Sequence, residues 1–125
     1  MNPFLSFLVG PFGAAFAVMN EYRFLPSTDS FTEFSDEMYE AYLIKEGKMP
    51  SERLFQMHAD SNTNEKEVLV VTKTEMEEFL KARQFVDHIT LEKDDLKDAS
   101  DVDRLDYFMK LFPILFPDKP QEEHL

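Results

Sequence analysis

Residues 54–71 read LFQMHADSNTNEKEVLVV, and this stretch decides the fold that the sequence predicts. Within it, EVLVV at 67–71 is rich in valine and typical of a β-strand, whereas DSNTNEK at 60–66 is a polar loop. LFQMHA at 54–59 fits either a short helix after Pro50 or the first arm of a hairpin, and we favour the strand. The two arms are then expected to pair across the loop.

The segment before this hairpin begins with an apolar stretch that carries no charge before Glu21. Pro11 is suited to the first turn of a helix, which we predict from about residue 11 to 24. Prolines and glycines interrupt the apolar run and no basic residues precede it, so we expect it neither to act as a secretory signal nor to cross a bilayer. The side expected to pack against protein consists of Phe12, Ala15, Phe16 and Met19.

A second helix is expected between this segment and the hairpin. Ser30-Phe31-Thr32-Glu33 has the spacing of a capping box, which predicts that the helix begins there. Gly47 is suited to the left-handed residue that ends a helix, and Pro50 follows it as a second barrier. Phe31 and Phe34 lie on the apolar side of this helix, where we interpret them as core residues together with Phe79 and Phe108.

Two more helices are predicted after the hairpin. Thr74-Glu75-Met76-Glu77 is a second capping box, opening a helix to about residue 87, after which 88–92 is a candidate third strand. Ser100 precedes an acidic first turn and opens a last helix, which we expect to end at Pro113.

These elements predict an α+β fold, a predominantly helical single domain with a small two- or three-stranded antiparallel sheet. The strands are expected at about 53–59 and 67–72, with 88–92 as the candidate third. The domain covers 1–125 and includes an apolar N-terminal arm at 1–10 and a polar C-terminal tail at 118–125.

The composition excludes several classes of function. Lys plus Arg is 13 and Asp plus Glu is 25, giving a net charge of −12, which repels nucleic-acid phosphates and anionic lipid headgroups. The absence of cysteine excludes disulfides and thiol nucleophiles, and three glycines do not build a phosphate-binding loop. We therefore expect no cofactor and no direct nucleic-acid binding, and we expect a cytoplasmic protein, since neither cysteines nor a signal peptide is present.

Two acid-rich segments are the candidate sites. Neither fits an EF-hand, because no register supplies alternating ligands with a glycine and a distal glutamate. Asp103 and Asp106 lie one helical turn apart, but this spacing is common on solvated helices, so we predict no metal site and no catalytic residue. The carboxylates expected to contact a partner are Asp29, Glu33, Asp36, Glu37, Glu40, Asp94, Asp95, Asp98, Asp101, Asp103 and Asp106.

The sequence thus favours a non-enzymatic interaction protein that binds a basic macromolecular partner through its carboxylate-rich helix faces, and that inhibits the partner where the covered surface is functional. A plain solvated surface explains the same acids. The alternative function is a structural subunit of a larger assembly, docked through apolar terminal residues onto protein or the membrane interface, with homo-oligomer formation also open. The residues for that contact are Phe4, Leu5, Phe7, Leu8, Phe12 and Phe116.

Overall fold

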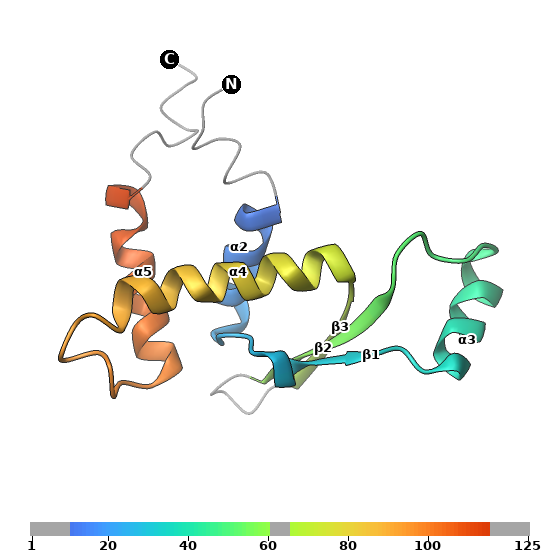
Figure 1. Ribbon diagram of the computed structural model, residues 1–125, viewed down its shortest axis with the longest axis horizontal. Coiled ribbons are helices and arrows are strands. Elements are labelled where there is room, and N and C mark those ends of the chain that lie inside the picture. The colour runs from blue at the N-terminus through green and yellow to red at the C-terminus, as the bar shows by residue number, and fades with distance from the viewer. Residues whose placement is uncertain (1–10, 61–65, 116–125) are drawn as a thin grey trace, which may run out of the picture.

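A computed structural model describes residues 11–60 and 66–115, with the side chains of 11–13, 60 and 66 outside the described set. Within these residues the chain forms four α-helices and a three-stranded antiparallel sheet, which confirms the predicted α+β class (Figure 1). The elements in chain order are α2 (Pro11–Tyr22), the 3-10 turn η1 (Thr28–Ser30), β1 (Phe31–Glu33), α3 (Asp36–Glu46), β2 (Leu54–Asp60), β3 (Lys66–Thr72), α4 (Lys73–Thr90) and α5 (Asp101–Leu115).

The predicted hairpin is confirmed. Strands β2 and β3 pair antiparallel from Leu54 opposite Thr72 to Asp60 opposite Lys66. The prediction that 88–92 forms the third strand is wrong. The third strand of the sheet is β1, which pairs with the edge of β2 that β3 does not occupy. The sheet order is therefore β1-β2-β3.

The predicted start of the second helix is also wrong. Ser30 ends a 3-10 turn that begins after Ser27, and the next three residues pair with β2 as a strand. Helix α3 begins at Asp36, where the Ser35 hydroxyl accepts a hydrogen bond from Met38 N at 3.3 Å. Its end is as predicted, since Gly47 has a φ of 78° and lies in the left-handed region.

Helix α4 begins two residues earlier and ends later than predicted. Its capping box joins Thr72 and Glu75, with Glu75 N donating to the threonine hydroxyl at 3.1 Å. The helix continues to Thr90 because the buried stripe of Phe79, Ala82 and Val86 extends to Thr90 at helical spacing. Residues 88–90 therefore belong to α4, and the predicted strand at 88–92 does not form.

Helix α5 begins as predicted, with the Ser100 hydroxyl accepting from Asp103 N at 3.1 Å. Its predicted end at Pro113 is wrong, because the helix runs through this proline to Leu115. Proline removes one helical hydrogen bond, but Phe112 is buried and Leu115 packs against the core, so burial holds the last turn in place.

The core lies where α2, α4 and α5 meet one another and one face of the sheet (Figure 1). Phe16 of α2 stacks on Phe108 of α5 with ring centroids 5.1 Å apart. Phe79 and Phe108 are buried as predicted, and Phe31 is half-buried against the Phe79 ring. The core residues of α2 are Ala15, Phe16 and Met19, three of the four expected, while the side chain of Phe12 lies outside the described set.

Helix α2 leaves this core through a left-handed residue. Arg23 has a φ of 57°, and Phe24 N donates to Met19 O at 3.2 Å, which is the hydrogen bond of a Schellman helix end. Met19 and Phe24, the two positions whose apolar side chains accompany this motif, are both buried in the core.

Candidate interaction surface

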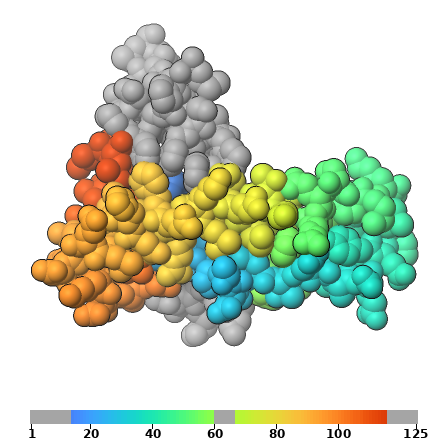
Figure 2. Space-filling model, viewed as in Figure 1, coloured from blue at the N-terminus to red at the C-terminus, as the bar shows by residue number. Residues whose placement is uncertain are grey.

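Helix α3 stands away from the rest of the fold. None of its 11 residues is buried. Figures 1 and 2 show it at one end of the long axis of the molecule, beyond the ends of the strands. A helix of this length is marginal in water unless an apolar face packs against protein. Residues 11–60 and 66–115 leave one face of α3 uncovered.

One tyrosine connects α3 to the sheet. The Tyr39 hydroxyl accepts a hydrogen bond from Leu54 N at 3.0 Å and donates to a Glu33 carboxylate oxygen at 3.5 Å. The same carboxylate lies 3.4 Å from Nε of Arg53, and the Phe34 ring packs against the Tyr39 ring with centroids 5.4 Å apart. These contacts fix which side of α3 faces the sheet.

The opposite side of α3 combines acids with an exposed aliphatic residue. Asp36, Glu37 and Glu40 are all exposed. Ile44 is 84% exposed, and it lies one turn after Glu40 and two turns after Glu37 on the same side of the helix. Large apolar side chains within an acidic surface are typical of protein contacts, where the apolar residue is buried and the charges select the partner.

The second acid-rich segment lies at the other end of the molecule. Asp94, Asp95 and Asp98 are exposed on the connection between α4 and α5, which Figures 1 and 2 show opposite α3 along the long axis. The acids of α3 and those of this connection therefore lie at opposite ends of the molecule, and of the two predicted acidic groups the structure brings only Asp29 and Asp101 together, in one pocket. Exposed Asp103 lies in the first turn of α5, beside this connection.

Other predicted acids have partners within the chain. Asp106 accepts a hydrogen bond from Nη2 of Arg23 at 2.8 Å, and this bond raises the pKa of the Arg23 guanidinium. Asp101 lies 3.7 Å from Nη1 of Arg104. These two carboxylates therefore form ion pairs within the fold, between different elements for Asp106 and within α5 for Asp101.

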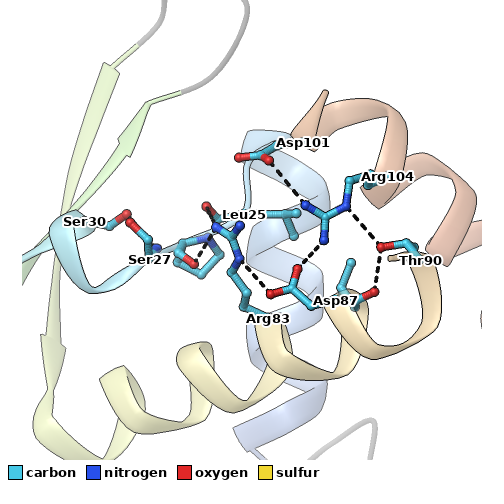
Figure 3. Close-up of polar contacts among 10 residues, drawn as sticks. Leu25, Ser27, Ser30, Arg83, Asp87, Thr90, Asp101 and Arg104 are labelled. Carbon is cyan, nitrogen blue, oxygen red and sulfur yellow. Dashed lines mark hydrogen bonds and ion pairs between the residues drawn. The ribbon is translucent and has the colours of Figure 1, made fainter. Parts of the chain in front are cut away.

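Arg104 forms a buried network that the sequence analysis did not predict. Its Nε donates to the Thr90 hydroxyl at 3.1 Å, and its Nη2 pairs with Asp87, as Figure 3 shows. Asp87 also lies 3.4 Å from Nε of Arg83, which reaches the carbonyl oxygens of Leu25 and Pro26 at 3.2 Å each. The ion pair between Arg83 and Asp87 could have been predicted from the sequence, because residues four positions apart meet on a helix. The contact of Asp87 with Arg104 could not, because Arg104 lies on a different helix, α5.

Half-buried Glu52 ties the connection before β2 to the start of α4. Its carboxylate accepts from the Thr74 hydroxyl at 2.6 Å and from Thr74 N at 2.9 Å. These hydrogen bonds hold the pKa of Glu52 below its ordinary value, with the side-chain bond as the larger cause.

A polar pocket of about 300 Å³ lies between the end of α2 and the sheet. It is lined in part by Arg23, Asp29, His58 and Asp101, which places two of the predicted acids beside a histidine. His58 Nε2 lies 3.4 Å from the Thr32 hydroxyl on the neighbouring strand. Ser27 and Ser30 also line the pocket, and the Ser30 hydroxyl accepts a hydrogen bond from Ser27 N at 3.0 Å.

In residues 11–60 and 66–115, no cluster of three or more histidine and carboxylate side chains has the arrangement of a metal site. None of the helices in this part of the chain combines the length and apolarity needed to span a bilayer. Of the apolar residues proposed for an alternative contact, Phe4, Leu5, Phe7, Leu8 and Phe116 lie outside the described residues, as does the side chain of Phe12.

Comparison of the chain with known protein families, curated proteins and solved structures found no match.

Proposed function

We propose that the chain is a non-enzymatic interaction protein that binds the basic surface of another protein through the outward side of α3. The observation that carries this proposal is a helix of 11 residues with no buried residue. Such a helix gains little from its own chain, whereas docking on a partner would bury its apolar residues.

The chemistry of this side specifies the partner. Asp36, Glu37 and Glu40 favour lysine and arginine on the opposing surface, and the net charge of −12 accelerates the approach of a basic protein. Ile44 supplies the apolar contact at the centre of the interface, and we expect the partner to have a shallow apolar pocket that receives this side chain. A partner whose basic surface is functional is inhibited when that surface is covered.

The partner is to be found by placing a photo-crosslinking amino acid at position 44 and irradiating cells of the source organism. A crosslinker at Lys110, which is exposed on α5, serves as the control position. The partner is the protein captured from position 44 and not from position 110.

Binding of the purified partner then tests the site. We expect Ile44→Ala to weaken binding about tenfold, which corresponds to roughly 1.4 kcal/mol. Glu37→Lys with Glu40→Lys should weaken it further and reduce its dependence on salt. The matched control is Asp94→Lys with Asp98→Lys, which changes the net charge equally at the other end of the molecule and should have less than about a threefold effect. Equal losses from both charge reversals would contradict the assignment to α3.

A further inference from the structure

Within residues 11–60 and 66–115, β3 is an edge strand, and its outer side pairs with no other strand. It has 7 residues and is the last strand in the order β1-β2-β3. In the described residues, β2 is its only neighbour in the sheet. An edge of this kind presents backbone N–H and C=O groups that another extended segment can pair with.

The hydrogen-bond phase identifies the backbone groups on this side. Lys73 N donates to Arg53 O at 2.9 Å, and this pair continues the β2–β3 register by one step. Because hydrogen-bonded pairs alternate along an antiparallel ladder, the odd-numbered residues of β3 bond to β2. The N–H and C=O groups of Val68 and Val70 therefore point outward, whereas Thr72 N is already bonded to a Glu75 carboxylate oxygen at 2.8 Å.

The middle of this edge lacks the usual protection against pairing. Charged residues and proline are the common protective features, but the sequence of β3 is KEVLVVT, with its charges confined to the first two positions. Val68 and Val70 are 50% and 58% exposed on the outer face of the sheet. The central residues of β3 are thus suited to binding a strand.

An apolar groove of about 320 Å³ lies beside the same strand. Leu69 and Val71 of β3 face it from the core side of the sheet, while α2 and α4 supply its other walls. The lining residues from α2 and α4 are Ala14, Ala15, Val18, Glu75, Glu78 and Phe79. A fourth strand at this edge would direct alternate side chains into the groove and the others alongside Val68 and Val70.

Charge determines which strand fits. Within the described part of the chain, both charged residues that line the groove are glutamates, Glu75 and Glu78. Glu67, at the start of β3, is a third acid at this edge, and partial burial together with this carboxylate raises the pKa of the Tyr22 phenol. A second copy of the chain would bring the same acids and another net charge of −12 to the edge, so its approach is opposed.

We propose that the outer edge of β3 binds an extended peptide segment of a partner, in which apolar residues alternate with lysine or arginine. The backbone pairs with Val68 and Val70, and apolar side chains of the peptide lie alongside the exposed side chains of these two valines. The basic side chains, on the other face of the peptide, reach the groove, where their methylene groups contact its apolar lining and their charges approach Glu75 and Glu78. This site is separate from α3, and the proposal does not depend on the one made for that helix.

The test uses the full chain and a short acetylated and amidated peptide of alternating lysine and valine. Val70→Pro removes one outward N–H group without removing a hydrogen bond to β2, so the sheet should persist. Val70→Thr is the matched control, because it keeps the N–H group and the branched β-carbon. NMR titration measures the affinity, and hydrogen exchange measures protection of the Val68 and Val70 amides.

We expect the peptide to protect both amides and to bind Val70→Pro at least about tenfold more weakly than the wild type. Val70→Thr should differ from the wild type by less than about threefold. A peptide of alternating glutamate and valine should bind at least about tenfold more weakly than the lysine peptide. Equal binding of both peptides, equal binding of Val70→Pro, or shifts confined to α3 would overturn the proposal. Concentration-dependent dimers of the wild type that Val70→Pro abolishes would assign the edge to a second copy instead.

Discussion

Arg104 shows how a charged residue can lie in the core of a small acidic protein. Its side chain is only 7% exposed, yet Asp87, Thr90 and Asp101 surround the guanidinium group. Among the described residues, no buried side-chain nitrogen or oxygen atom lacks a hydrogen-bond partner. Removing a single partner from such a network leaves a buried charge without compensation, which destabilises more than the bond itself contributes.

The first prediction concerns Asp87, which holds both Arg83 and Arg104. We expect Asp87→Ala to lower the free energy of unfolding by about 2 kcal/mol, the value being moderated by the partial exposure of the carboxylate. Asp94→Ala, which removes an exposed carboxylate, should change it by less than about 0.5 kcal/mol. Urea unfolding followed by circular dichroism gives both values, and a loss at Asp87 no larger than that at Asp94 would show that the network is not stabilising.

At the scale of the element, α3 should unfold locally while the rest of the molecule remains folded. Gly47 ends this helix at a φ of 78°, and no atom lies within 4 Å of a β-carbon added there. Gly47→Ala therefore introduces backbone strain of about 1 kcal/mol and no steric clash.

We expect this change to accelerate amide exchange in α3 about fivefold, and to leave exchange in α4 unchanged. Hydrogen exchange measured residue by residue by NMR tests the expectation, with Lys48→Ala as the control substitution next to the glycine. Parallel acceleration in α4 would mean that α3 unfolds together with the core.

Local patterns were predictable from the sequence, whereas long-range pairing was not. The β2–β3 hairpin follows from a valine-rich run and the polar loop before it, both visible within 18 residues. Strand β1 has only 3 residues, and its role depends on pairing with β2, more than 20 positions away. The Ser30 to Glu33 spacing matched a capping box, but pairing with β2 prevailed over this local preference.

The candidate site was predicted only in part, for the same reason. The acidic character of α3 was predicted, because charged residues can be read directly from the sequence. That Ile44 lies outward among them was not predicted, since the expected helix began near Ser30 and its apolar side was assigned to the core. The buried role of Arg104 depends on a residue from another helix, which no local pattern reveals.

At the scale of the whole molecule, the net charge of −12 acts on the fold as well as on partners. Two acidic ends and few basic residues produce a repulsion that favours expanded states, and dissolved salt screens it. We expect the thermal unfolding midpoint to rise by about 3 °C between low salt and 0.5 M NaCl.

Circular dichroism melts at several salt concentrations measure this effect. A variant with Glu37, Glu40, Asp94 and Asp98 changed to the corresponding amides should show a smaller rise, because part of the repulsion has been removed. A midpoint that falls as salt is added would mean that the ion pairs of Arg23, Arg83 and Arg104 outweigh the repulsion.

The position of α3 along the chain has an evolutionary consequence. The helix lies between β1 and β2, two strands that pair with each other, and it contributes no buried residue to the core. Selection for folding therefore acts on Tyr39 and the residues that anchor the segment, and leaves the outward residues of α3 free to diverge. A lineage could alter or exchange this segment, and with it the choice of partner, while the hairpin and the three packed helices are inherited unchanged.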